Sequence, residues 1–203
     1  MTKARILVVC TGNICRSPYI ERLLDDAMTR AWGGEAIEVR SAGMRGLQDY
    51  QMEPHAHARL EQLGLSAPDF RSRYIEEHHV DAGDLVLTAT TEHRKAVVRL
   101  RPPALARTLT FREFGMLAAT LGADELPQTD DARTWVREVT ASLRRRRGQQ
   151  PIGDLDIADP YTLGDRAYDD MASQVGEVLP WVTWALTGRD RPVLATKADG
   201  ALG

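Results

Sequence analysis

The residues best suited to carry out chemistry are consecutive. They are Cys10, Thr11, Gly12, Asn13, Ile14, Cys15, Arg16, Ser17 and Pro18. A cysteine thiolate is a nucleophile, and both a nearby cation and a helix N-terminus favour this form. Arg16 offers two parallel N–H donors to the oxygens of a phosphate. The Ser17 hydroxyl can donate a hydrogen bond to the sulfur. These residue types suit transfer of a phosphoryl group to the Cys10 sulfur. The alternative is that Cys10 is a small apolar residue at the end of a buried strand.

The elements that flank this stretch would position it as an anion site. Residues 6–9 are apolar and β-branched, which indicates a buried parallel strand. A helical pattern begins at Ser17, an expected N-cap, with Pro18 at the first helical position. The helix dipole and the free amides there attract anions. Gly12 permits a tight turn and Asn13 tolerates the left-handed conformation, so the loop can form a concavity of successive amides.

Strand and helix patterns alternate along most of the chain. Further strands are expected at residues 37–41, 84–88 and 107–110, and further helices at 55–63, 92–100 and 166–186. This alternation predicts the α/β class, in three α/β/α layers around a four-stranded parallel sheet. Ligands of such sheets bind beyond the carboxyl ends of the strands. The sequence therefore places the 10–18 loop where a ligand site is expected.

The length of 203 residues predicts one domain, which we place at residues 1–188. Two additional helical patterns, at 112–121 and 130–147, suggest a helical insertion at about 112–154. Residues 189–203 are rich in Arg, Asp, Pro and Gly, and we expect a disordered tail there. The run Arg144 to Arg147 closes a predicted helix, where cations complement the dipole. It is expected to be a solvated helix end, with a docking site for an acidic partner or lipid as the alternative.

Composition excludes several classes of protein. Lys and Arg total 26 against 29 Asp and Glu, a net charge of −3, which gives no reason to expect binding to nucleic acid. No apolar stretch of about 18 residues occurs, so no membrane insertion is expected, and the N-terminus lacks the core of a signal peptide. A cytoplasmic location follows as the expectation. Two cysteines cannot make a disulfide scaffold, and without histidines they cannot make a four-ligand zinc site. Neither a metal nor a cofactor is expected, because the five histidines have no ligand spacing with the cysteines: His55, His57, His78, His79 and His93.

The string VCTGNICRSP at positions 9–18 resembles the signature of low-molecular-weight protein tyrosine phosphatases. The resemblance continues in Ser41-Ala42-Gly43, Leu47 and Glu53-Pro54, and in Asp159-Pro160-Tyr161, which looks like the family's general-acid loop. It covers about residues 4–111 and 155–187, and it points to the bacterial type with an insertion before the acid loop. The resemblance implies the Rossmann-like fold of this family and hydrolysis of phosphotyrosine in proteins through a cysteinyl phosphate.

By this resemblance, Cys10 is the nucleophile, Arg16 clamps the phosphate and Asp159 is the general acid and base. A solvated turn is the alternative reading of Asp159, and Asp154 and Asp156 are competing candidates for the acid. The expected substrate- and phosphate-binding residues are Thr11, Gly12, Asn13, Ile14, Cys15, Ser17, Leu47 and Tyr161. The ring of Tyr50 is an alternative to Leu47 at the mouth of the cleft.

The partner implied is a phosphotyrosine-containing protein, for example a bacterial tyrosine kinase; the sequence leaves the oligomeric state open. Two other functions compete with hydrolysis. One is arsenate reduction with a small thiol as co-substrate, since no cysteine follows Cys15 to relay a disulfide. The other is binding of phosphate or phosphotyrosine without turnover. For Cys15, a reversible disulfide with Cys10 that protects the nucleophile and a purely structural role remain equal alternatives.

Overall fold

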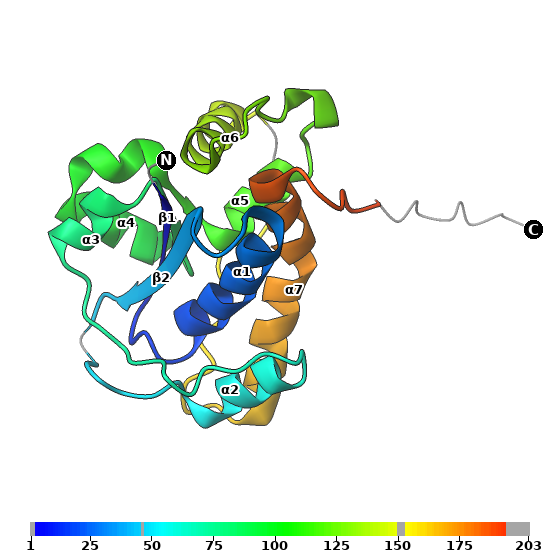
Figure 1. Cartoon of the computed structure of the whole chain (residues 1–203). Coiled ribbons are helices and arrows are strands. Elements are labelled where there is room, and N and C mark those ends of the chain that lie inside the picture. The colour runs from blue at the N-terminus through cyan, green and yellow to red at the C-terminus, as the bar shows by residue number, and fades with distance from the viewer. Residues whose placement is uncertain (1–2, 46, 150–152, 194–203) are drawn as a thin grey trace, which may run out of the picture.

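The computed structural model describes residues 3–45, 47–149 and 153–193. Its centre is a four-stranded sheet made of β1 (Ala4–Cys10), β2 (Ile37–Gly43), β3 (Leu85–Thr88) and β4 (Thr108–Thr110). The strands are all parallel and lie in the order β2-β1-β3-β4 (Figure 1). The predicted α/β class and four-stranded parallel sheet are confirmed.

Helices cover both faces of the sheet and make the outer two layers (Figure 1). One face is covered by α1 (Arg16–Trp32), α2 (Pro54–Glu61), α5 (Phe111–Ala118) and α7 (Asp165–Thr187). The α6 helix (Ala132–Arg146) packs on the same core near the amino ends of the strands, where Arg133 and Arg137 contact Asp84. The other face is covered by α3 (Glu77–Ala82), α4 (Thr91–Leu100) and the 3-10 helix η1 (Pro102–Arg107). A second 3-10 helix, η2, spans Ala123–Glu125. Side chains alternate across β1: Ile6 and Val8 belong to the first core, and Leu7 and Val9 to the second. The run of apolar residues in β1 is therefore buried on both faces.

The carboxyl end of β1 delivers Cys10 to the edge of the sheet, beside the end of β2. A Cβ atom added to Gly43, the last residue of β2, would lie 2.7 Å from the carbonyl oxygen of Thr11. Only glycine permits this approach, because real Cβ atoms are not found that close to a backbone oxygen. Behind the loop, the amide of Met44 donates to the carbonyl of Cys10 at 2.9 Å. The end of β2 thus supports the loop that follows β1.

The start of the first helix differs from the prediction. The α1 helix begins at Arg16, with Cys15 at the N-cap, so the expected N-cap role of Ser17 is wrong. The Ser17 hydroxyl instead lies 3.0 Å from the Cys10 sulfur. The short α3 helix was not expected at all. The other predicted elements are present, and their ends differ from the predicted ones by no more than three residues.

The segment expected as an insertion packs into the same core as the rest of the chain. In α5, a Cβ atom on Gly115 would lie 2.6 Å from the Cβ of Val178, so the two helices α5 and α7 approach closely. In α6, Val136 and Leu143 are fully buried. The indole of Trp135 donates to the carbonyl of Ala185 in α7 at 2.9 Å. Residues of α5 and α6 therefore belong to the same hydrophobic core as α1 and α7. The assignment of residues 1–188 to one domain, and the status of the segment as an insertion relative to the family, stay predictions.

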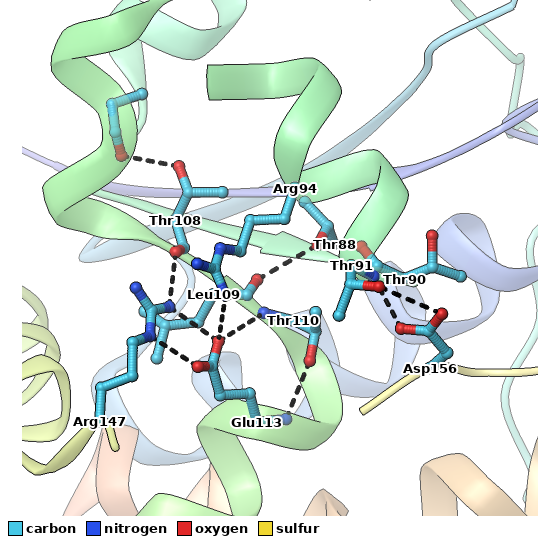
Figure 2. Close-up of polar contacts among 11 residues, drawn as sticks. Thr88, Thr90, Thr91, Arg94, Thr108, Leu109, Thr110, Glu113, Arg147 and Asp156 are labelled. Carbon is cyan, nitrogen blue, oxygen red and sulfur yellow. Dashed lines mark hydrogen bonds and ion pairs between the residues drawn. The ribbon is translucent and has the colours of Figure 1, made fainter. Parts of the chain in front are cut away.

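The arginine run at the end of α6 is solvated only in part. Arg144 and Arg145 are exposed. Arg147 donates to both oxygens of Glu113 at 2.6 and 2.7 Å and to the carbonyl of Thr108 at 3.0 Å (Figure 2). The side chain of Glu113 is 3% exposed. The expectation of a solvated helix end is thus wrong for Arg147, which covers the edge strand β4.

Residues 194–203, most of the expected disordered tail, lie outside the described residues. In the part of the tail that is described, Arg191 packs over the ring of Trp184 and donates to the carbonyl of Leu121 at 3.0 Å. Within the described ranges, no cluster of three metal-ligating side chains occurs. No helix among them is long and apolar enough to cross a membrane.

Candidate active site

The sulfur of Cys10 lies inside the loop that joins β1 to α1. The backbone amide of Asn13 donates to Sγ at 3.3 Å, and the hydroxyl of Ser17 lies 3.0 Å from it. Asn13 has φ of 57°, the left-handed conformation that asparagine tolerates better than most residues. This turn directs the Asn13 amide toward the sulfur. Both contacts place a donor where it stabilises negative charge on sulfur.

The side chain of Asn13 holds the loop in this shape from behind. Its amide nitrogen donates to the hydroxyls of Ser17 at 2.9 Å and Ser41 at 2.7 Å. Its amide oxygen accepts from the backbone of Arg73 at 2.9 Å. Because Ser17 accepts from Asn13, its own hydrogen is free to point at Cys10. Ser41 in turn donates to Glu21, and burial raises the pKa of that carboxyl. The Asn13 position was predicted, but its partners Ser41 and Arg73, and the contact of Ser41 with Glu21, were not.

Arg16 is the cation of the site, and its side chain is only 4% exposed. One terminal nitrogen donates to the carbonyl of Ile157 at 3.2 Å. The other donates to the hydroxyl of Thr11 at 3.1 Å and to a carboxylate oxygen of Asp159 at 2.6 Å. Its Nε atom is buried and has no hydrogen-bond partner among the described residues. A buried donor without an acceptor is costly, so this atom is suited to an oxygen of a bound anion.

Asp159 comes from the loop before α7 and reaches Arg16 across 143 positions of sequence. Hydrogen bonds of the residues just before Asp159 attach this loop to the segment that follows β3. The amide of Ile157 donates to the carbonyl of Ala89 at 2.9 Å, and Asp156 accepts from the amide of Thr91 at 2.7 Å (Figure 2). Of the three candidate acids, Asp159 alone lines the cavity beside Cys10. Asp156 anchors the loop on α4, and Asp154 accepts from the amide of Asp156 at 3.0 Å.

A cavity of about 350 Å³ opens over the sulfur. Ten residues line it: Cys10, Thr11, Gly12, Ile14, Cys15, Arg16, Arg45, Leu47, Asp159 and Tyr161. Every predicted site residue thus lines the cavity except Asn13 and Ser17, which are fully buried and contact the Cys10 sulfur instead. Tyr50 is 57% exposed and is not among the lining residues, whereas Leu47 is. Arg45 lines the cavity and was not predicted.

The second cysteine of the loop has a different environment from the first. Cys15 is 4% exposed, and its sulfur lies 3.7 Å from the hydroxyl of Tyr168. Burial raises the pKa of Cys15 to about 12, so it remains a thiol at neutral pH. Burial also raises the pKa of Tyr168. Both cysteines are free in the structure. A disulfide between them stays a prediction.

His93 is the main polar residue near the site that sequence reasoning missed. It lies in the first turn of α4, and its Nε2 is 2.9 Å from the hydroxyl of Thr11. Burial, together with the positive charge of Arg16, lowers the pKa of His93 to about 4. The sequence signal is its place just after the carboxyl end of the third strand, where ligand sites of parallel sheets form.

The comparison with known proteins finds one matching family. Its sequence model, described as low molecular weight phosphotyrosine protein phosphatase, matches residues 5–149. The chain belongs to this family. The match includes the Cys10 loop and ends before Asp159, so the assignment of the acid depends on the geometry described above.

Individual relatives agree with this membership. A protein-arginine-phosphatase of Geobacillus stearothermophilus is 34% identical over 110 residues, which is 54% of this chain and 70% of the relative. A low molecular weight protein-tyrosine-phosphatase of Streptomyces coelicolor is 27% identical over 175 residues, 84% of this chain and 86% of the relative. Among solved structures, the YwlE arginine phosphatase of Geobacillus stearothermophilus superposes with a TM-score of 0.66 at 25% identity, covering 91% of this chain and 94% of that one. This enzyme family is one of phosphatases, and the predicted enzyme class is confirmed.

Proposed function

We propose that the protein hydrolyses phosphotyrosine in protein substrates through a phosphorylated cysteine. One observation carries the proposal: the Cys10 sulfur, the unpartnered Nε of Arg16 and the carboxylate of Asp159 belong to residues that line one cavity. These groups supply a nucleophile, an anion clamp and a proton donor. The substrate would be a phosphotyrosine protein of the cytoplasm, for example a bacterial tyrosine kinase.

In the first step the Cys10 thiolate attacks phosphorus in line with the tyrosyl oxygen. An S–P bond forms, the P–O bond to tyrosine breaks, and its electron pair remains on the tyrosyl oxygen. Asp159 in its acid form gives that oxygen a proton, so the product leaves as neutral tyrosine. Arg16 donates to phosphate oxygens through Nε and a terminal nitrogen, which balances the charge of the transferred group. Loop amides at the start of α1 would add further donors.

In the second step the carboxylate of Asp159 accepts a proton from water, and the water oxygen attacks phosphorus. The S–P bond breaks and inorganic phosphate forms. The electron pair of the S–P bond returns to sulfur, which leaves as the thiolate. Ser17 and the amide of Asn13 stabilise the departing sulfur with the contacts already described, at 3.0 and 3.3 Å. The cycle needs no metal or redox partner, because every proton and electron pair is supplied by Asp159, Cys10 and water.

The walls of the cavity favour an aryl phosphate. Ile14 and Leu47 present apolar surface, and Tyr161, 52% exposed, offers a ring at the mouth. A phenyl ring gains burial and stacking against such walls. The relatives named as arginine phosphatases make phosphoarginine the alternative substrate. The guanidinium of phosphoarginine would need polar partners in the cavity. The lining residues offer it one carboxylate, that of Asp159.

The test compares four substrates on one enzyme preparation: a phosphotyrosine peptide, a phosphoarginine peptide of the same sequence, a phosphoserine peptide, and arsenate with a small thiol. We expect turnover of phosphotyrosine above all others and none by the Cys10→Ser variant, which should still bind orthovanadate. Arsenate-dependent oxidation of the thiol would favour the reductase alternative. Binding of phosphotyrosine without phosphate release would favour the non-enzymatic one.

A further inference from the structure

His93 is joined to the phosphate-binding loop by an unbroken row of hydrogen bonds. Its Nδ1 lies 2.8 Å from the hydroxyl of Thr90, and its Nε2 lies 2.9 Å from the hydroxyl of Thr11. The same Thr11 oxygen accepts from a terminal nitrogen of Arg16 at 3.1 Å. That nitrogen also contacts Asp159 at 2.6 Å. The row thus runs from α4 through the loop to the cation and the acid.

The positions of the protons in this row follow from what each group can do. Arg16 can only donate, so the Thr11 oxygen is its acceptor. The hydrogen of the Thr11 hydroxyl is then free for His93, and a neutral ring can accept it at Nε2. A neutral ring that accepts at Nε2 carries its proton at Nδ1, which donates to Thr90. A neutral His93 with its proton at Nδ1 therefore completes the row with every donor matched to an acceptor.

The charges around the ring keep His93 neutral. Arg16 of α1 faces it and disfavours a second positive charge. Asp159 and Asp156 of the acid loop and Glu92 of its own helix act in the opposite sense, but burial outweighs them. In a protonated ring Nε2 is a donor, and the Thr11 oxygen would then accept from two positively charged groups, the ring and Arg16.

We propose that His93 is a positioning residue, which acts through Thr11 to hold the Arg16 guanidinium in the orientation that receives phosphate. Holding a long side chain in one orientation before the ligand arrives reduces the entropy lost on binding. The bond to Thr11 is not needed to cap α4, because the Thr90 hydroxyl already accepts from the His93 amide at 3.2 Å. Its effect is therefore on the loop. The role in catalysis rests on the proposed function, whereas the effect on anion affinity does not.

The experiment measures the affinity for inorganic phosphate by calorimetry, together with kcat and KM for an aryl phosphate. The variants are His93→Ala, Thr11→Val and the double variant, with His78→Ala, an exposed histidine of α3, as the matched control. We expect roughly tenfold weaker phosphate binding in each single variant, since each breaks one hydrogen bond of the row that holds the Arg16 guanidinium. The double variant should bind no more weakly than Thr11→Val alone, because both changes break the same row.

A conservative variant separates positioning from a general loss of structure. In His93→Gln an amide oxygen can again accept from Thr11, so phosphate affinity should recover toward that of the parent, while His93→Leu should not recover. Losses that multiply in the double variant, or a lower melting temperature with unchanged phosphate affinity, would overturn the proposal. A parent protein that binds phosphate but does not turn over aryl phosphate would contradict the proposed function and leave the affinity comparison valid.

Discussion

A terminal nitrogen of Arg16 lies 2.6 Å from a carboxylate oxygen of Asp159, and this contact joins the residue proposed as phosphate clamp to the residue proposed as proton donor. The two side chains differ in exposure, 4% for Arg16 and 50% for Asp159. Arg16 is held in the interior by three polar partners, whereas Asp159 stands at the mouth. In the proposed reaction, phosphate would take over the donors of Arg16, which would release the carboxylate toward the leaving group. The proposed roles of the two residues are therefore coupled through this contact.

Asp159→Asn is expected to reduce kcat by about 10² to 10⁴ for phenyl phosphate, whose leaving group needs a proton. The loss should be much smaller for p-nitrophenyl phosphate, because nitrophenolate leaves without one. Steady-state rates on both substrates measure the ratio. Asp154→Asn is the matched control, an exposed carboxylate of the same loop that does not line the cavity. Equal losses on both substrates would remove Asp159 from the acid role.

Arg16→Lys is expected to lower kcat/KM for an aryl phosphate by at least roughly tenfold, although the positive charge is retained. An ammonium is a point charge and cannot offer the two parallel donors of a guanidinium. Phosphate inhibition should weaken in proportion. Arg99→Lys, at an exposed position of α4, serves as the control. A variant with the parent's phosphate affinity would show that charge alone suffices.

The sequence predicts the sheet and the loop well, because both depend on local signals. The buried strands are short apolar runs, and the nine-residue loop carries its own chemistry. The α3 helix was missed because it has only six residues and buries only Val80, so it has no apolar period to detect. The N-cap assignment of Ser17 was wrong for another reason. Cap preferences describe a hydroxyl near a helix start, but they contain no information on a sulfur seven positions earlier.

Contacts between distant segments mark the limit of prediction. The partner of Arg147 is Glu113, 34 positions upstream, and the run of four arginines alone does not indicate which one will be buried. Likewise Thr11 and His93 are 82 positions apart. Both pairs become neighbours only when the strands β3 and β4 join the sheet, so no local pattern identifies them. Cys10 and Arg16, in contrast, lie at the two ends of one loop, between β1 and α1, so the local sequence identifies both.

Glu113→Ala is expected to lower the free energy of unfolding by about 3–5 kcal/mol, because it leaves the guanidinium of Arg147 without its buried partner. Arg94, 3.5 Å from the same carboxylate, loses a contact as well (Figure 2). Urea unfolding measures the change. Arg145→Ala, exposed in the same arginine run, should change stability by less than about 0.5 kcal/mol. A loss for Glu113→Ala no larger than the control's would show that the buried pair contributes little.

At pH 7.5, iodoacetamide is expected to modify one cysteine per chain, and this should be Cys10. The pKa of Cys15, raised to about 12 by burial, leaves almost no thiolate to react. Peptide mass mapping identifies the modified residue, and inorganic phosphate should slow the reaction by occupying the cavity. The Cys10→Ser variant is the control and should remain unmodified under the same conditions. Rapid modification of Cys15 in the folded chain would contradict the burial of its sulfur.

Acid is expected to destabilise the fold partly through His93. Its pKa is about 4 in the folded chain, against about 6.5 for an unperturbed histidine, so between these values the unfolded chain binds more protons. The free energy of unfolding should therefore fall by up to about 3 kcal/mol as the pH drops from 6.5 to 4, and should not depend on this group above that window. Urea unfolding at several pH values measures the slope. His93→Gln should flatten it, whereas His78→Ala should not. An unchanged slope in His93→Gln would mean that His93 titrates normally in the folded chain.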